Sequence, residues 1–449
     1  MKTENIDTNQ YNSIDKQVSF IDRCRTPPMG WNSWDAWGTG ITETDVRANA
    51  EFMAAHLARY GWRYVVVDIQ WYQPNASGHD YDPEARLEMD QWGRLQPAPN
   101  RFPSGFQALG EYIHSLGLKF GIHIMRGIPR QAVRENLPVK PADARALAGT
   151  EVRAGDIADA ENGCAWNPDM YGVDMTRPGA QRWYDSLMEL YASWGVDFIK
   201  ADDAASHLYQ PEEIKAIHRA IEKCGRPMVL SLSPGPAPVS EAAFFRRWAH
   251  MWRISDDFWD SWPLLRRQFD FAREWAPFIG MDNAWPDADM LPLGKLRIAA
   301  SGGAGEDSRF TKDEQLTMMN LWAIIRSPLM MGGDLPRSDA WSISLLCNPD
   351  LIAVNQRSRG NRVLSWTPDS CAWIAENPEG GWHLAVFNLS DRKSRIGFSL
   401  GEAAPGVRKF SAVDIWSGRA FTLPSRYSVV LSPHASVLYK LEPALKAVR

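Results

Sequence analysis

The chain has 449 residues, of which 45% are hydrophobic and 23% are charged, and its formal net charge is −5. This length exceeds one small domain and suits one large α/β barrel with an appended domain. The apolar runs are shorter than the ~20 residues of a membrane-crossing helix, and the negative charge argues against nucleic acid as a partner. We expect a globular protein without a membrane span that binds a neutral ligand.

Residues 1–20 are polar and lack the basic-then-apolar order of a signal peptide. We predict that this segment is flexible and that the protein is cytoplasmic, although a chain that had lost a signal would look the same. The five cysteines contain no CxxC pair, and the nine histidines contain no HxH or HExxH arrangement. We therefore expect no disulfide framework, no metal and no other cofactor.

From residue 28 onward, apolar strands alternate with amphipathic helices, which predicts βα units and a parallel sheet. The predicted strands lie at 29–34, 64–71, 119–126, 195–204, 227–235, 251–258, a segment ending at 287–290, and 328–331. The predicted helices lie at 42–60, 106–116, 179–194, 211–224, 262–275, 311–325 and 342–352. Eight such units predict a (β/α)8 TIM barrel over residues 21–358.

Two segments of the predicted barrel, 72–101 and 127–174, have no regular period. Loops of this length in a compact domain are usually functional walls or lids, which we expect for the first. Beyond residue 358 the pattern changes to short alternating runs broken by Gly, Pro, Asn and Ser. This pattern predicts a C-terminal antiparallel β-sandwich domain over residues 359–449.

Polar residues stand at the ends of several predicted strands, where TIM barrels place their catalytic groups. The central example is the strand at 195–204, which rises from apolar residues into Lys200, Asp202 and Asp203. The full set of polar or aromatic strand-end residues is Trp34, Asp68, His123, Lys200, Asp202, Arg253, Asp257 and Asp289. Asp203 has a second interpretation, as a cap of the following helix.

Asp202 and Asp257 form a pair of carboxylates that could cleave an acetal, one as nucleophile and the other as proton donor. Lys200 would keep Asp202 ionised, because a nearby cation favours the charged form. We expect burial and the neighbouring Asp256 to favour a protonated Asp257. His123 is interpreted as a pocket wall or core residue. The 21 tryptophans fit either core packing or stacking against sugar rings.

Several motifs resemble the family 27 glycoside hydrolases, the α-galactosidases (melibiases) and α-N-acetylgalactosaminidases. They are TPPMGWNSW at 26–34, KAD at 200–202, WRISDD at 252–257, DADML at 287–291 and DLIAVNQ at 350–356. The resemblance covers residues 27–356 and includes the trailing β domain. It implies a retaining mechanism without a metal, with Asp202 as nucleophile and Asp257 as acid/base. It also implies sugar contacts from Trp34, Asp68, Lys200, Arg253 and Asp289.

Three positions depart from this family pattern. Ile69 stands where the family usually has a second aspartate that contacts the galactose 4- or 6-hydroxyl. Ser233 stands where the α-galactosidases have glutamate and the acetamido-sugar enzymes have serine, which suggests room at C2. His123 replaces a tyrosine. We include all three among the residues expected to bind substrate.

The sequence thus predicts a retaining exo-α-glycosidase that acts on a terminal galactose-configured sugar of a glycoside or oligosaccharide. Galactose stands narrowly ahead of N-acetylgalactosamine, and β-L-arabinopyranose is a further alternative. A different class, a non-catalytic carbohydrate-binding protein, would use the tryptophan-rich cleft for binding alone. A homo-oligomer is compatible with the sequence.

Overall fold

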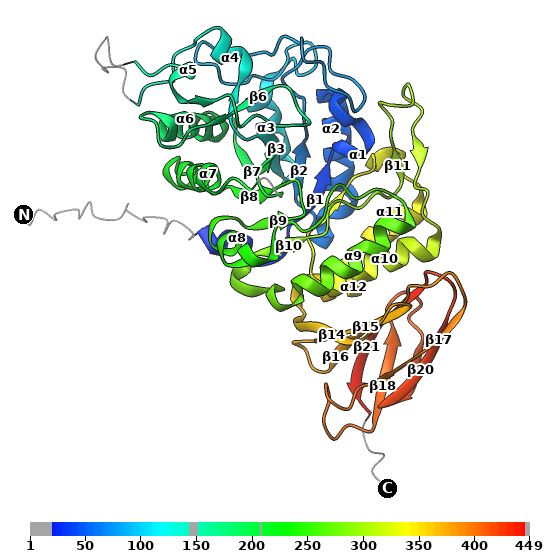
Figure 1. Cartoon of the computed structure of the whole chain (residues 1–449). Coiled ribbons are helices and arrows are strands. Elements are labelled where there is room, and N and C mark those ends of the chain that lie inside the picture. The colour runs from blue at the N-terminus through cyan, green and yellow to red at the C-terminus, as the bar shows by residue number, and fades with distance from the viewer. Residues whose placement is uncertain (1–19, 143–150, 207–208, 445–449) are drawn as a thin grey trace, which may run out of the picture.

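The computed structural model describes residues 20–142, 151–206 and 209–444. It contains a barrel in the N-terminal three quarters of the chain and a β-sandwich at the C-terminal end (Figure 1). This confirms the predicted fold class. The predicted flexible segment 1–20 lies outside the described residues, except for Phe20, whose buried ring packs against His250.

The barrel sheet has eight parallel strands within the described chain. In chain order they are β1 (Met29–Asn32), β2 (Tyr64–Val67), β3 (Lys119–Met125), β7 (Val196–Asp202), β8 (Val229–Leu232), β9 (Met251–Arg253), β10 (Trp285–Asp287) and β13 (Leu329–Met331). Hydrogen bonds join neighbours in the order β10-β9-β8-β7-β3-β2-β1-β13. Leu291, just after β10, closes the ring through a parallel bridge to Met331.

Helices on the outside of the barrel follow the strands, as βα units require. They are α2 (Glu43–Phe52), α3 (Gly105–Ser115), α6 (Ala180–Ser193), α7 (Pro211–Lys223), α8 (Ala242–Trp248), α9 (Trp262–Trp275), α10 (Lys312–Ile324), α11 (Ala340–Leu346) and α12 (Pro349–Arg357), with a short α1 (Trp34–Trp37) at the strand-end face. The predicted helix 42–60 ends as regular α-helix at Phe52 and continues as π and 3-10 turns to Tyr60.

The last predicted barrel helix, 342–352, is two helices, and the break has a local cause. The side chain of Asn348 accepts hydrogen bonds from the backbone N–H groups of Asp350 and Leu351, as an N-cap does. Pro349 follows as the first residue of α12, where its fixed φ favours a helix start and its missing N–H costs no hydrogen bond.

The described residues of the segment 127–174, which the sequence left unassigned, form a small antiparallel sheet with two short helices near the strand-end face of the barrel (Figure 1). Its elements are β4 (Ile128–Pro129), α4 (Arg130–Arg134), α5 (Ala154–Ile157), β5 (Ala158–Asp159) and β6 (Met170–Val173). A further hairpin, β11 (Lys295–Leu296) with β12 (Glu306–Asp307), follows β10.

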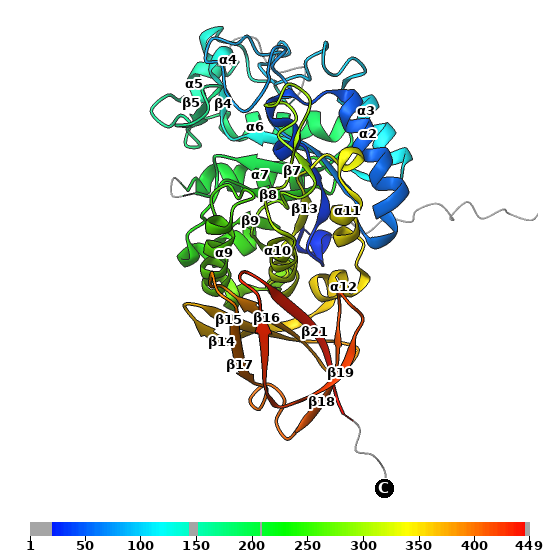
Figure 2. The same ribbon diagram turned by 90° about the vertical axis from the view of Figure 1, so that its right-hand side faces the viewer.

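The C-terminal domain is an antiparallel sandwich of a larger and a smaller sheet, and all its inter-strand pairings are antiparallel. Its strands are β14 (Arg359–Thr367), β15 (Ser370–Glu376), β16 (Trp382–Asn388), β17 (Ser394–Ser399), β18 (Lys409–Asp414), β19 (Ala420–Pro424), β20 (Arg426–Leu431) and β21 (Ser436–Pro443). Figure 2 shows this domain against α10 and α12, away from the strand-end loops. Helix α10 is buried nearly all round because it lies between the barrel and the sandwich.

An apolar cluster fills the barrel interior on the strand-start side and packs beneath the polar residues at the strand ends. Its members are inward-facing residues near the strand starts: Tyr64, Val66, Phe198, Val229, Met251 and Trp285, with Cys24, Met290 and Met330. The indole of Trp285 donates a hydrogen bond of 2.8 Å to the carbonyl oxygen of Cys24, so the 3-10 turn at Phe20–Cys24 packs against the strand-start end.

Candidate active site

The site is built by strand alternation, because residues two apart on a strand face the same side of the sheet. On β7 the inward series is Phe198, Lys200 and Asp202, which runs from the apolar cluster to the strand end. On β2 the same alternation leads from Val66 to Asp68 just after the strand. In each series the polar groups therefore stand only toward the C-terminal end of the strand, and these groups meet at one face of the barrel.

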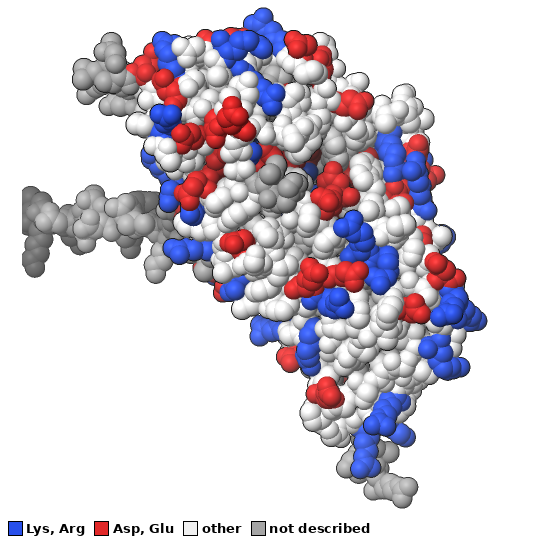
Figure 3. Space-filling view, in the orientation of Figure 1, with Lys and Arg blue, Asp and Glu red and all other residues white. Residues whose placement is uncertain are grey.

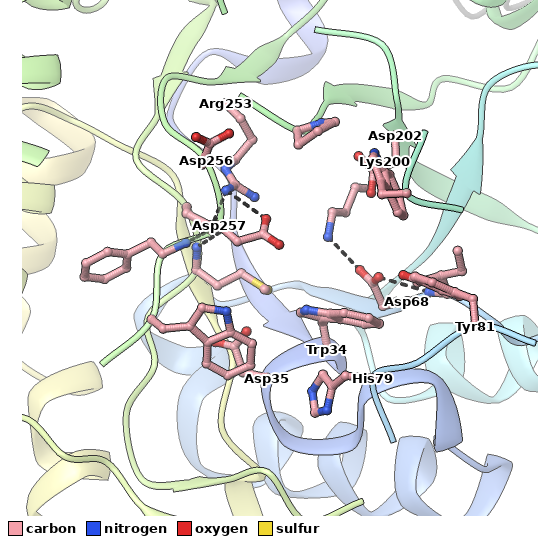
Figure 4. A pocket seen from close by; sticks show the side chains of 17 residues that line it. Trp34, Asp35, Asp68, His79, Tyr81, Lys200, Asp202, Arg253, Asp256 and Asp257 are labelled. Carbon is pink, nitrogen blue, oxygen red and sulfur yellow. Dashed lines mark hydrogen bonds and ion pairs between the residues drawn. The ribbon is translucent and has the colours of Figure 1, made fainter. Parts of the chain in front are cut away.

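The polar strand ends surround a pocket of about 470 Å³. Its lining includes seven of the eight predicted strand-end residues, together with Ile69. The seven are Trp34, Asp68, Lys200, Asp202, Arg253, Asp257 and Asp289. In Figure 4, Arg253 and Asp257 stand on one side of the open space, Lys200, Asp202 and Asp68 stand on the other, and Trp34 lies below. The structure thus brings both predicted carboxylates to one cavity.

Asp202 is held as a carboxylate by its neighbours. His123 Nε2 lies 3.0 Å from Asp202 Oδ2, and the backbone N–H of Asp203 donates to Oδ1 at 3.0 Å. Burial alone would raise the pKa of Asp202, but His123 and the charge of Lys200 outweigh it and hold the pKa well below its usual range. An ionised carboxylate is the form that a nucleophile requires.

Lys200 and Asp68 form a buried ion pair on the same wall as Asp202 (Figure 4). Lys200 Nζ lies 2.8 Å from Asp68 Oδ2, which also accepts a hydrogen bond of 2.7 Å from the Asn32 amide. Burial disfavours both charges, yet the pair lowers the pKa of Asp68 and raises that of Lys200. A fixed carboxylate and ammonium side by side can bind adjacent sugar hydroxyls.

Arg253 joins two acids on the other wall. Its Nη2 lies 2.6 Å from Asp289 Oδ2 and 3.2 Å from Asp257 Oδ1. Asp289 is fully buried, and burial raises its pKa despite Arg253. The Asp257 side chain is 61% exposed, which differs from the burial expected from the sequence. Its aromatic sequence neighbours Trp252 and Phe258 are themselves buried.

Asp35 is a further acid in the pocket wall that the sequence reasoning missed. It is 1% exposed, and its Oδ2 has no hydrogen-bond partner among the described residues. Burial, reinforced by the carboxylate of Asp289, raises its pKa well above the usual range. A Cβ atom at Gly332 would collide with this oxygen, so the glycine leaves space for it. The only sequence signal was its place directly after Trp34.

His123 and Ser233, expected from the sequence to bind substrate, do not line the pocket. His123 is fully buried and contacts Asp202, so it can act on the sugar only through that carboxylate. Ser233 is 1% exposed and lines a small cavity in the barrel interior, whereas its neighbour Pro234 lines the pocket. The expected space beside Ser233 is therefore not part of the main cavity.

Asp203 does not cap the following helix, whose N-cap residue is Gln210. Its Oδ2 lies 2.8 Å from Arg126 Nη2, and Arg126 also pairs with Glu213 at 2.9 Å. The guanidinium thereby ties the end of β3 to the end of β7 and to α7. This network sits behind Asp202 and fixes the strand end that carries it.

Aromatic residues from the loops form the rim of the pocket. The ring of His79 makes edge contacts with Trp34 and Trp259, at centroid distances of 5.0 Å and 5.8 Å. Tyr81 and Trp166 complete the rim and lie 5.8 Å apart. His79 and Tyr81 come from the segment 72–101, which was expected to form a functional wall. Other tryptophans are fully buried and pack the core, among them Trp31, Trp62 and Trp71.

In the space-filling view, acidic side chains lie within a recess on the barrel part, while basic and acidic side chains are interspersed over the rest of the face shown (Figure 3). Within the described residues, no cluster of three or more His, Cys, Asp or Glu side chains is arranged to hold a metal ion. None of the helices in those residues combines the length and apolarity needed to cross a bilayer.

Comparisons with known proteins agree with this architecture. The family model described as alpha galactosidase A matches residues 26–133 and 170–357, and the model for the alpha galactosidase C-terminal beta sandwich domain matches residues 368–441. Alpha-galactosidase 2 of Arabidopsis thaliana is 25% identical over 428 residues, which cover 93% of this chain and 89% of the relative.

Two solved structures are more similar in sequence. A family 27 β-L-arabinopyranosidase from Geobacillus stearothermophilus is 49% identical, with a TM-score of 0.90 and coverage of 96% of this chain and 99% of the other. A putative α-N-acetylgalactosaminidase from Bacillus halodurans is also 49% identical, with a TM-score of 0.82 and coverage of 93% and 97%. The chain belongs to the family 27 glycoside hydrolases and is a glycosidase that acts on glycosides.

Proposed function

We propose that this glycosidase is a retaining exo-enzyme that removes terminal β-L-arabinopyranose, the galactose-configured sugar that lacks the exocyclic hydroxymethyl group. The observation that carries the sugar assignment is Ile69. Its side chain lines the pocket, is 2% exposed and directly follows Asp68, the acid paired with Lys200. An apolar wall at this point favours a sugar without a hydroxyl group there.

The catalytic proposal assigns the first step to Asp202 and Asp257. The Asp202 carboxylate attacks the anomeric carbon as the bond to the leaving oxygen breaks, and Asp257 gives its proton to that oxygen. Water then cleaves the covalent glycosyl–enzyme: its oxygen bonds to the anomeric carbon, its proton passes to Asp257, and Asp202 leaves as a carboxylate. Two inversions give net retention. The low pKa of Asp202 and the position of both acids on one pocket support these roles.

The remaining polar groups would bind and orient the sugar. The Asp68–Lys200 pair on one wall and the Asp289–Arg253 pair on the other offer charged acceptors and donors to the ring hydroxyls. Trp34 lies below the open space and can contact an apolar sugar face. His123 is proposed as a positioning residue that orients Asp202 rather than as a sugar contact.

The alternatives differ at C6 and C2 of the sugar. An α-galactosidase is the second candidate, because the curated relatives carry that name and the Asp68–Lys200 pair is present. An α-N-acetylgalactosaminidase needs room for an acetamido group at C2. The burial of Ser233 outside the pocket lining and the position of Pro234 in that lining argue against such room.

The test compares kcat/KM for nitrophenyl glycosides of β-L-arabinopyranose, α-D-galactose, α-N-acetylgalactosamine and α-D-glucose. Burying a hydroxyl against Ile69 without a hydrogen bond costs about 1–3 kcal/mol, so we expect the arabinoside to be preferred over the galactoside by about 5- to 150-fold. Ile69→Asp is expected to reverse or abolish this preference, and Ile69→Leu to keep it. Faster cleavage of the galactoside by the wild type would overturn the assignment at C6.

A further inference from the structure

A second hollow, of about 660 Å³, continues from the rim of the pocket. The two cavities share His79, Tyr81 and Trp166, so a molecule that leaves the pocket on this side passes directly into the second one. Burial, together with the nearby Asp202 carboxylate, raises the pKa of the Tyr81 phenol above its usual range. We call this second hollow the aromatic groove.

Trp166 is the prominent side chain of the aromatic groove. It is 40% exposed, and among the described residues only Met281 and Val430 are other large hydrophobic side chains with comparable exposure. Its ring packs against Tyr81 at an interplanar angle of 48°, which leaves part of the indole open to solvent. A half-exposed indole beside a sugar pocket offers a flat apolar surface for the C–H face of a second pyranose.

Polar groups lie beside this indole. Asn167 is 1% exposed, and its side-chain nitrogen finds no acceptor among the described residues, whereas its Oδ1 accepts a hydrogen bond of 2.9 Å from the Asp169 N–H. Arg130 also lines the groove, with its guanidinium 4.9 Å from the centre of the Tyr171 ring. Asp80 adds an exposed carboxylate. The Asn167 amide, the Arg130 guanidinium and the Asp80 carboxylate place polar groups around a flat ring, an arrangement that suits a hydroxyl-rich ligand.

The base of the aromatic groove is rigidly tied to the barrel. Asp169 Oδ2 accepts hydrogen bonds from Gln70 at 2.6 Å and from the Tyr72 hydroxyl at 2.7 Å. These bonds join the segment that carries Trp166 to the end of the strand that carries Asp68. The groove residues 164–168 also fall in the part of the chain, 134–169, that the family model leaves unmatched. Other residues of the groove, among them His79, Tyr81 and Arg130, lie in the matched part.

We propose that the aromatic groove is a subsite for the leaving group, and that it binds a second sugar residue of an oligosaccharide through stacking on Trp166. The inference rests on the proposed glycosidase site, because the groove has this meaning only if the terminal sugar occupies the pocket. It assigns the substrate to an oligosaccharide whose penultimate unit is itself a pyranose, in place of a simple alkyl or aryl glycoside.

The test compares three substrates of the same terminal sugar: the glycosyl fluoride, which has no leaving-group sugar, the nitrophenyl glycoside, and an oligosaccharide capped with that sugar. For Trp166→Ala we expect kcat/KM on the oligosaccharide to fall about tenfold, mainly through KM, and kcat/KM on the fluoride, which places nothing in the groove, to fall by much less. Trp166→Phe keeps a flat ring and is expected to retain most of the activity. Met281→Ala, an equally exposed residue away from the pocket, is the matched control.

Each contrary outcome has a distinct meaning. An unchanged oligosaccharide rate in Trp166→Ala overturns the subsite. An equal loss on all three substrates shows that Trp166 supports the pocket itself, and a loss on the nitrophenyl glycoside as large as that on the oligosaccharide assigns the groove to aromatic leaving groups. The terminal sugar is whichever one the wild type cleaves, so an error in the C6 assignment leaves the comparison valid. If the wild type does not cleave the glycosyl fluoride of any of the four sugars compared above, the catalytic proposal is refuted as well.

Discussion

The contact between His123 and Asp202 gives the sharpest prediction about the site. Both side chains are buried, the nitrogen and oxygen atoms lie 3.0 Å apart, and an ionised carboxylate can only accept, so the imidazole donates. A hydrogen bond to a charged group contributes about 1.5–3 kcal/mol. Since one pKa unit corresponds to about 1.4 kcal/mol, loss of this donor is expected to raise the pKa of Asp202 by about 1–2 units.

The perturbation is His123→Phe, which removes the donor and keeps a ring of similar size. The measurement is kcat/KM for a nitrophenyl glycoside as a function of pH. In the wild type the acidic limb lies low, because Asp202 must be ionised to attack and its pKa is held below the usual range. In the variant this limb is expected to move to higher pH by about 1–2 units, with a smaller change near neutrality.

Two further variants separate this effect from general damage. His123→Gln retains an N–H donor and is expected to restore part of the shift. His56→Phe changes an exposed histidine in the π turn that follows α2 and is expected to leave the profile unchanged. An acidic limb that does not move in His123→Phe, with activity retained, would refute the reasoning that His123 controls the charge of Asp202.

Two predictions concern buried ionisable side chains. Lys200→Met leaves Asp68 buried without its cation, so the free energy of unfolding in urea is expected to fall by about 3–5 kcal/mol. The double variant Lys200→Met/Asp68→Asn should regain much of the lost free energy of unfolding. A decrease of less than about 1 kcal/mol in Lys200→Met alone would contradict a buried pair. Burial raises the pKa of Asp35, so this carboxyl keeps its proton in the folded protein. In the unfolded chain the same carboxyl releases its proton above about pH 4. The free energy of unfolding therefore decreases as the pH rises above that value. Asp35→Asn is therefore expected to raise the melting temperature relative to wild type more at pH 7 than at pH 4, and an equal change at both values would show that Asp35 is ionised in the fold.

The barrel was predictable because its signals are local. Each strand is a short apolar run, and the alternation of side chains along β7 carries Lys200 and Asp202 to the same end of the barrel. The break at Pro349 is also a local effect and could have been read from the sequence. The positions that the sequence could not resolve depend on how deep a side chain lies within the barrel.

Depth and loop packing account for the differences at the site. His123 and Asp202 pair across adjacent strands, and the register of β3 with β7 places the imidazole beneath the carboxylate rather than in the pocket. Asp257 follows its strand by four residues and reaches solvent. Trp166 lies in a segment without periodicity, and the loop contacts that bring it to the rim are distant in sequence.

The central claim is that Asp202 and Asp257 act in turn on one anomeric carbon. The direct test is the configuration, by proton NMR, of the glycosyl azide that Asp202→Ala and Asp257→Ala form from a nitrophenyl glycoside in the presence of azide. Without the nucleophile, azide attacks the substrate once and the product is expected to be inverted. Without the acid/base, azide attacks the glycosyl–enzyme and the product is expected to keep the configuration of the substrate. The same configuration from both variants, or full hydrolysis by Asp202→Ala without azide, would contradict the claim.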